Sequence, residues 1–565
     1  MAFLDDVIEQ YHPTYDPYQA YDHPSGHRVM KYSAGQAVIY TPFFLAAHAF
    51  ASVSEAYPAD GFSRPYQFMM SLGSLVIAFL GLYWLHRVLR EYFRPGIVGM
   101  TLLLLTLGTN YLNYAAIDGA MTHSTVFSLY ALLLLTTHRF YLRATFGRAA
   151  LIGVCVGLAA LTRPTEILAA LIPLLWGLDV GASGAIGRRL RFLGEHYGEL
   201  LLAAGVTLAI GAVQLLYWQY VTGEWVVYSY QDQGFDWLAP HLNQGFFSYK
   251  AGWLIYTPLM ALSLLGFYAL WRHRRGLFAA LFVHALLFIY VAFAWSVWWY
   301  GGSLGQRTMV QAYAPLSFPL AAFLTAVYGR FSGARSRVQG EETKSKGISL
   351  GGRITVAATT IFILLSVWHN LYWTHQAHRG GLFVTEQMTA AYFWRVLYTF
   401  DRNPDDRLAL DTSQFAPEDA PVLDTLYQNN FETDNPRPCA NYPISGQGSL
   451  CLKNKQQNSP DFAQRLDLPE GTWLRASVRA RVDRRRDNKD NYAQMIMAFR
   501  RDGREVRRRL IRLHRVLNHD MDREVHLDSR IPNGGADEVI VWFWNGGDAQ
   551  PGLVLDELRL LRLGE

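Results

Sequence analysis

The stretch HSTVFSLYALLLLTTHRFYLRATFGR, residues 123–148, decides the fold of this chain. Its first part is apolar over the length of a membrane helix, and its end carries Arg139, Arg143 and Arg148. About 20 apolar residues in a helix cross a hydrocarbon core about 30 Å thick. The stretch therefore predicts a membrane-spanning helix that ends in a basic loop.

The same pattern recurs along residues 67–374, so we predict a multi-pass α-helical membrane domain with about ten transmembrane helices. The predicted spans are 67–90, 98–116, 123–141, 148–162, 164–179, 198–220, 253–271, 276–296, 307–328 and 354–374. Proline interrupts a helix, and Pro164 follows Arg163 between two short spans. Two short helices or one kinked helix fit this pair, and the alternation of loop charge favours two.

Basic residues alternate between the loops on the two sides of these spans. One set of loops carries eighteen Lys and Arg residues, while the other set carries only Arg163, Lys250 and Arg307. Lys and Arg in short loops stay on the cytoplasmic side during insertion. We therefore place the basic loops inside, and the other loops and the C-terminal region on the opposite, extracytoplasmic side.

The N-terminal region, residues 1–66, contains one short apolar segment at 37–54, with Pro42 and His48 inside it. We interpret it as an extracytoplasmic helix that lies along the membrane surface or re-enters it. No signal sequence precedes it. An external N-terminus of this length needs a helix that translocates it, so we expect that the natural first transmembrane helix is missing from the chain.

Composition and motifs narrow the function classes. The formal net charge is +5 at pH 7, and much of the basic excess lies in the inside loops, so no nucleic-acid partner is predicted. The sequence contains no Walker loop, dinucleotide fingerprint, HExxH, nucleophile elbow or CxxC pair. This weakens the hypotheses of an ATP-driven pump, a zinc protease and a redox enzyme.

The C-terminal part is soluble in character. Residues 375–420 read as a linker with a helix, and residues 421–565 contain alternating runs such as TWLRASVRARV and EVIVWFW. Period-two alternation between turn residues predicts an all-β sandwich. Cys439 and Cys451 flank a short loop and would form a disulfide in an oxidising compartment if their Cα atoms lie close enough; the sequence leaves both states open. Cys155 lies in an apolar helix and is expected to be a packing residue.

Polar residues at the outer ends of the spans are the candidates for chemistry. Asp118 and His123 share a short outside loop, and an acid at a membrane mouth is a functional candidate. Asp118 would alternatively cap the next helix. Asp5 and Asp6 belong to an acidic N-terminal segment in which a carboxylate would act as general base on an acceptor hydroxyl.

Four cations on the outside form the second group: Lys31, Arg163, Lys250 and Arg307. A cation at this surface binds a lipid phosphate, although snorkelling to headgroups explains it equally well. Aromatic and polar residues of two outside loops form the third group, and their mixture suits a sugar-binding cleft as well as an interfacial belt. These residues are Tyr230, Asp232, Trp237, His241, Trp298 and Tyr300.

Five stretches together resemble bacterial membrane glycosyltransferases of the C type, relatives of protein O-mannosyltransferases and of the aminoarabinose transferase of lipid A. They are KYSAGQAVIYTPFFLAAHAFA, PADGFSRPYQ, IDGAMTHSTVFSLYALLL, GLAALTRPTEILAALIPLLWG and WYGGSLGQR. The resemblance covers about residues 20–375. The tail looks like a carbohydrate-binding jelly roll, in which the first and last strands pair and acids near 430–432 and 554–558 sometimes hold a structural calcium.

The resemblance implies transfer of a sugar from a polyprenyl-phosphate donor to a glycan, lipid or protein acceptor at the outer face of the bacterial inner membrane. It also implies a catalytic acid in the first outside loop, directly after the first transmembrane helix. That helix and its aspartate are expected to be missing from this chain, and Asp5 and Asp6 are the candidates that take their place. Asp118 and His123 match its second outside loop, and Arg163 and Arg307 are phosphate-binding candidates by position. No metal ligands are predicted, although a divalent cation stays open.

Two other function classes are weighed against this interpretation. A transporter or flippase for a lipid-linked saccharide needs charged residues in the middle of its helices, and the predicted spans contain almost none. A catalytically inactive glycan-binding membrane protein would explain the missing first-loop acid. It would not explain why the polar residues gather on one face of the membrane.

Overall fold

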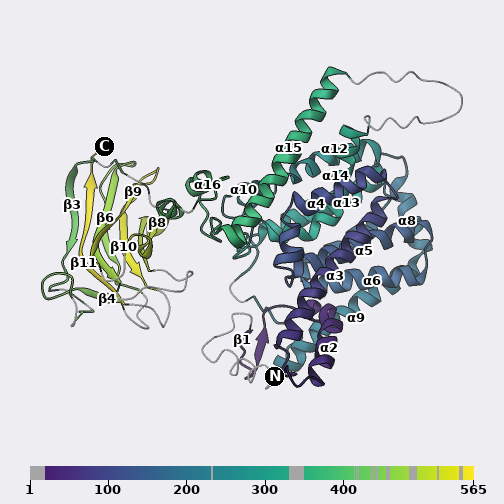
Figure 1. Cartoon of the computed structure of the whole chain (residues 1–565), viewed down its shortest axis with the longest axis horizontal. Helices are drawn as coiled ribbons and strands as arrows, with labels where there is room; N and C mark the ends of the chain where they lie inside the picture. The colour runs from purple at the N-terminus through teal and green to yellow at the C-terminus, as the bar shows by residue number, and fades with distance from the viewer. Residues whose placement is uncertain are drawn as a thin grey trace. The chain divides into compact units, whose positions relative to one another are not determined.

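The structure is a computed structural model that divides into two compact units, Met1–Glu386 and Gln387–Glu565. The first unit is helical and the second is mostly β (Figure 1). The structure describes residues 20–230, 233–329, 349–401, 403–412, 414, 416–417, 419–433, 435, 437–439, 443–452, 458–482, 493–517, 521–545 and 552–564.

The first unit begins with a small hairpin and continues as a helix bundle. The hairpin consists of β1 (Ala20–Asp22) and β2 (Arg28–Met30). The α-helices are α2 (Gly35–Ser52), α3 (Arg64–Leu89), α4 (Pro95–Leu107), α5 (Thr122–Leu142), α6 (Phe146–Thr162), α7 (Leu171–Leu175), α8 (Ala185–Glu195), α9 (Tyr197–Thr222), α10 (Leu242–Phe247), α11 (Trp253–Tyr256), α12 (Met260–His273), α13 (Arg275–Ala294), α14 (Tyr313–Tyr328) and α15 (Leu350–His375). Four tighter or wider helical turns connect them: η1 (Asn113–Ile117), η2 (Pro164–Ala170), η3 (Arg307–Ala312) and η4 (Gln376–Gly380).

Five helical segments in the described ranges are long and apolar enough to cross a membrane. They are Arg64–Leu89, Tyr197–Thr222, Arg275–Ala294, Arg307–Tyr328 and Leu350–Gly380, and three shorter apolar helices accompany them. The multi-pass helical character of this part is confirmed, whereas the number of about ten spans is not. Helix α6 ends at Thr162 and η2 starts at Pro164, so the two short spans around Arg163 are separate helices.

The helices at the surface of the first unit expose many large apolar side chains, whose contact with water would be unfavourable. Phe79 of α3, Leu208 of α9 and Leu364 of α15 are 74%, 73% and 63% exposed. A soluble protein rarely shows apolar faces of this extent. These faces are suited to lipid.

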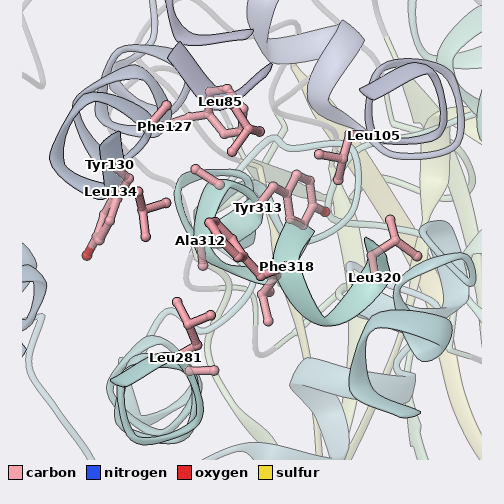
Figure 2. Close-up of a cluster of buried hydrophobic side chains, with 14 of the residues drawn as sticks. Leu85, Leu105, Phe127, Tyr130, Leu134, Leu281, Ala312, Tyr313, Phe318 and Leu320 are labelled. Atoms are coloured by element: carbon pink, nitrogen blue, oxygen red, sulfur yellow. The ribbon is translucent and has the colours of Figure 1, made fainter. Parts of the chain in front are cut away.

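Helices α3, α4, α5, α13 and α14 bury their side chains in one core. Figure 2 shows Leu85, Phe127 and Tyr313 among the side chains that meet there, and all three are fully buried. Helix α12 packs closely on α14. A Cβ added at Gly266 would collide with the carbonyl oxygen of Pro319, so only glycine permits this approach.

The second unit starts with α16 (Ala390–Val396) and η5 (Pro404–Leu410) and continues as a β-sandwich. One sheet has the strand order β5-β10-β7-β8, and the other has β3-β11-β6-β9 with β4 paired to β11. The strands are β3 (Val422–Asn429), β4 (Leu450–Leu452), β5 (Phe462–Arg465), β6 (Trp473–Val482), β7 (Gln494–Arg501), β8 (Arg504–Arg512), β9 (Arg523–Arg530), β10 (Glu538–Trp544) and β11 (Leu553–Leu563). The first strand, β3, pairs with the last, β11, as the jelly-roll resemblance implied.

Alternation along the strands builds the sandwich core. Leu474, Ala476, Val478 and Ala480 of β6 are fully buried, since every second residue of this strand faces the opposite sheet. They join the buried side chains of the other strands in one cluster. The predicted all-β character of the C-terminal part is therefore confirmed.

The acids at the strand ends anchor loops through hydrogen bonds. Asp556 Oδ2 accepts from the backbone N–H of Ser445 at 3.0 Å and from the hydroxyl of Ser449 at 2.9 Å. Glu432 accepts from the backbone N–H of Gln447 at 3.0 Å. Within the described ranges, no group of three or more His, Cys, Asp or Glu side chains is placed to hold a metal ion. These carboxylates serve loop closure here, and the calcium stays a prediction.

The cysteines occupy two environments. Cys439 and Cys451 form a disulfide, with their Cα atoms 5.2 Å apart. This bridge ties the loop before β4 to the sandwich, because Cys451 lies in a strand that pairs with β11. Cys155 is a buried free thiol inside α6, in the packing position that its apolar surroundings predicted.

Candidate functional site

A cavity of about 910 Å³ lies in the first unit where several helices end. Its walls come from segments that are far apart in the sequence: 31–36, 120–123, 162–168, 228–230, 233–235, 288–302, 307–308 and Glu386. The loops among these segments are ones that the charge pattern places outside. The basic loops lie at the opposite ends of α5, α6 and α13, so the cavity opens at the poorly basic ends of the bundle.

Three cations line the cavity: Lys31, Arg163 and Arg307. The Arg163 guanidinium lies over the ring of Tyr300, 5.6 Å from its centroid, and the Lys31 ammonium lies 5.4 Å from the Tyr230 centroid. In the described part of the chain, none of the three cations forms an ion pair with a carboxylate. The site therefore offers positive charge to a bound anion.

Local contacts position these cations. The backbone carbonyl of Lys31 accepts a hydrogen bond from Ser229 Oγ at 2.8 Å, which joins the β2–α2 turn to the loop after α9. Arg163 has an extended backbone between α6 and η2, since Pro164 excludes it from helix. Arg307 starts η3, and the loop before it is held by Tyr114, whose hydroxyl accepts from the Leu304 N–H at 3.0 Å.

His123, at the start of α5, lines the same cavity and is 3% exposed. Its Nδ1 atom is buried and has no hydrogen-bond partner among the described residues. Its ring meets that of Tyr114 edge-on, with centroids 5.5 Å apart. A buried imidazole nitrogen without a protein partner is available to a bound ligand.

Tyr230 and Tyr300 are the predicted sugar-binding residues that reach the cavity. Tyr300 has a left-handed backbone, with φ 56°, and its hydroxyl donates to the Ala292 carbonyl at 2.7 Å. Burial raises the pKa of the Tyr300 phenol, although the neighbouring Arg163 opposes this shift. The phenol therefore stays neutral and presents a ring face to the guanidinium.

The remaining candidates of this group in the described residues, Trp237, His241 and Trp298, do not line the cavity. Trp237 stacks on Phe235 with centroids 4.5 Å apart, and His241 pairs with Asp236 at 2.8 Å. Trp298 is 9% exposed, and its carbonyl accepts from Gln306 at 2.9 Å. These residues support the loops whose other members reach the cavity.

Asp118 and Lys250 also lie outside the cavity lining. Asp118 accepts from the Asn113 amide at 2.9 Å and lies 4.0 Å from His378. The N-cap of α5 is Met121, and no side chain caps this helix, so the alternative that Asp118 caps it is wrong. The Lys250 ammonium lies over Trp299, 3.5 Å from its centroid. Asp5, Asp6 and Asp232 lie outside the described residues.

Two carboxylates in the lining were not singled out from the sequence, namely Glu166 and Glu386. Glu166 is fully buried, and its two oxygens accept from the Tyr130 hydroxyl at 2.7 Å and from the Gln311 amide at 2.5 Å. An acid inside the apolar stretch 164–179 was the signal for Glu166, because ionisable residues are rare in membrane helices. Glu386 lies after the last span, where no local pattern marks it.

No family model matches the chain, and no curated protein matches it. Among solved structures, ArnT from Cupriavidus metallidurans in the apo state is similar at 14% identity and a TM-score of 0.36, covering 62% of this chain and 66% of that one. Arabinosyltransferase EmbB from Mycobacterium smegmatis is similar at 12% identity and a TM-score of 0.32, covering 87% of this chain and 57% of that one.

A third structure matches a smaller share of the chain. The CBM22-1 xylan-binding domain from Paenibacillus barcinonensis Xyn10C has 11% identity and a TM-score of 0.20, and it covers 25% of this chain and 96% of that domain. The chain spans less than two thirds of the length of ArnT and of EmbB. The structures to which this chain is similar therefore include an arabinosyltransferase and a xylan-binding domain.

Proposed function

We propose that this chain transfers a sugar from a polyprenyl-phosphate-linked donor to the hydroxyl of a glycan, lipid or protein acceptor. One observation carries the proposal: Lys31, Arg163 and Arg307 line a single cavity together with two carboxylates and four tyrosines, at the poorly basic ends of the helices. Separately, each of these residues has an ordinary structural explanation. Their convergence is what a phosphate-linked sugar needs.

The cations suit the leaving group. When the bond between the anomeric carbon and the phosphate oxygen breaks, negative charge grows on the phosphate. Fixed cations in a site shielded from water stabilise that charge far better than bulk solvent does. Arginine also binds phosphate through two parallel N–H donors. Arg163 and Arg307 are the proposed phosphate ligands, with Lys31 as the third cation.

The cavity and its surroundings suit a lipid-linked sugar. Ligand sites commonly have volumes of about 300–1,000 Å³, and 910 Å³ lies in the upper part of that range. Tyrosine faces pack against the CH faces of sugars, and Tyr230 and Tyr300 present such faces. The exposed apolar helices suit a membrane in which the polyprenyl chain of such a donor would lie. We assign the cavity to the outer side of the bacterial inner membrane, where the β-sandwich would hold the acceptor.

The test uses the purified full chain in lipid nanodiscs, incubated with a panel of polyprenyl-phosphate sugars. Release of polyprenyl phosphate, measured by mass spectrometry, supports the proposal. Arg163→Gln and Arg307→Gln should each lower kcat/KM by about 10²–10³. Arg87→Gln is the matched control, because Arg87 lies at the basic end of α3, against Tyr83. A wild-type chain that consumes no lipid-linked sugar contradicts the proposal.

A flippase for a lipid-linked saccharide is the second candidate, favoured by one observation that the sequence did not show. Glu166, Tyr130 and His284 form a buried polar chain inside the helix bundle, with 2.9 Å between His284 Nε2 and the Tyr130 hydroxyl. Buried ionisable residues of this kind occur on transport pathways. A flippase would move the intact donor between leaflets and release no polyprenyl phosphate, so the same incubation separates the two functions.

A further inference from the structure

Transfer of a sugar to a hydroxyl also requires an acceptor for the hydroxyl proton. The cavity lining contains two carboxylates in the described part of the chain, Glu166 and Glu386. A carboxylate is the usual group for this task when it can reach the hydroxyl. The assignment below rests on the proposed function, and it asks which of the two carboxylates meets the acceptor.

Glu166 is held by the protein itself. Both of its oxygens accept short hydrogen bonds, one from Tyr130 and one from Gln311, and the side chain is fully buried. A carboxylate in that setting is a fixed part of the wall. It has to break a buried hydrogen bond before it can accept a proton from a ligand.

Glu386 has the opposite setting. Its side chain is exposed and lines the cavity, and it forms no hydrogen bond or ion pair with any described residue. Its backbone is left-handed, with φ 65°, a region that residues with a Cβ rarely adopt. Such conformations persist where the surroundings enforce them, and they concentrate at ligand sites.

Two glycines of the loop 299–307 lie against Glu386 and its neighbour Thr385. A Cβ added at Gly301 would lie 3.6 Å from Glu386 Oε1, and one added at Gly302 would lie 3.7 Å from Thr385 Oγ1. Gly301 follows Tyr300, whose ring faces the Arg163 guanidinium. The free carboxylate and a proposed phosphate ligand therefore flank the same short loop.

We propose that Glu386 is the general base of the transfer. Its carboxylate takes the proton of the acceptor hydroxyl, and the acceptor oxygen forms a bond to the anomeric carbon of the donor. The bond from that carbon to the phosphate oxygen breaks, and its electron pair leaves with polyprenyl phosphate. Glu386 then releases its proton to solvent, for which its exposed position is suited.

The experiment compares Glu386→Gln, Glu386→Gly and Glu386→Asp in the full chain in nanodiscs. The single-turnover rate of sugar transfer should fall about 10²–10⁴-fold in the glutamine and glycine variants, because that is the usual contribution of general base catalysis. The donor Kd, measured with a fluorescent polyprenyl-phosphate analogue, should stay at the wild-type value. The aspartate variant should retain partial activity with a shifted pH profile.

Glu386→Gly separates catalysis from folding, because glycine suits a φ of 65° and should preserve thermal stability. Added formate should restore part of its transfer rate by supplying a carboxylate. Glu224→Gln is the matched control, an exposed glutamate of a neighbouring loop that does not line the cavity.

If Glu386→Gln transfers the sugar at the wild-type rate, the assignment of Glu386 as general base is overturned, and the proposed function stays intact. A loss of donor affinity that accounts for the whole loss of rate also overturns it, because the side chain would then act in binding. A wild-type chain without any donor consumption overturns the proposed function itself.

Discussion

At the scale of single residues, the cavity combines three half-buried cations with a fully buried carboxylate. Lys31, Arg163 and Arg307 face an open volume, whereas Glu166 lies within a closed hydrogen-bonded chain. Buried carboxylates are costly unless hydrogen bonds satisfy both oxygens. The partners Tyr130 and Gln311 meet that condition. They hold Glu166 in place in η2, the helical turn that directly follows Arg163.

Substitution of Glu166 tests this structural role. Glu166→Ala should destabilise the chain by about 1–3 kcal/mol, because the Tyr130 hydroxyl and the Gln311 amide would lose a buried acceptor. Glu166→Gln keeps an acceptor oxygen and the side-chain volume, so its cost should be smaller. The melting temperatures of the two variants and of the wild type are measured by thermal unfolding in detergent, with size-exclusion chromatography as the readout. Equal melting temperatures for wild type and both variants would show that the hydrogen-bonded chain contributes nothing to stability.

At the scale of elements, helix ends and close helix contacts determine the site. The helix break at Arg163 and Pro164 separates α6 from η2, and it places the Arg163 side chain at the cavity. The packing of α12 on α14 depends on Gly266, which lies against the Pro319 carbonyl. Since η3 leads directly into α14, this packing also supports the position of Arg307.

Gly266→Val should therefore destabilise the first unit by about 1–3 kcal/mol, the usual cost of forcing extra atoms into a packed contact. Gly205→Ala is the control, because a Cβ at this position of α9 meets nothing within 4 Å. Thermal unfolding monitored by intrinsic fluorescence compares the two variants. A Gly266→Val chain as stable as Gly205→Ala would mean that the helices do not meet at this glycine.

At the scale of the whole molecule, an apolar helical unit is joined to a β-sandwich that has its own core. The proposed function requires the cavity and the C-terminal unit to be on the outer side of the membrane. Loop charge supports that orientation, since the cavity opens where basic residues are scarce.

Reporter fusions test the orientation. Alkaline phosphatase fused after the C-terminus should be active, and green fluorescent protein at the same position should be dark, because each folds on only one side of the membrane. The same reporters placed in the basic loop after α12, near Arg274, should give the opposite result and serve as the control. Fluorescence from the C-terminal fusion would show that the C-terminus is cytoplasmic. The membrane orientation would then be the opposite of the one proposed, and a donor site on the outer side would have no basis.

Hydropathy, loop charge and period-two alternation determined the helical membrane unit, the β-sandwich and the candidate cations Lys31, Arg163 and Arg307, because these are properties of neighbouring residues. Only the tertiary structure decided which outer residues share a cavity. It included Glu166 and Glu386, and it left Asp118, Lys250 and Trp237 outside the lining. The physical reason is that packing contacts between distant segments, such as Tyr114 with Leu304 and Lys31 with Ser229, bring the helix ends together. No local pattern encodes such a meeting.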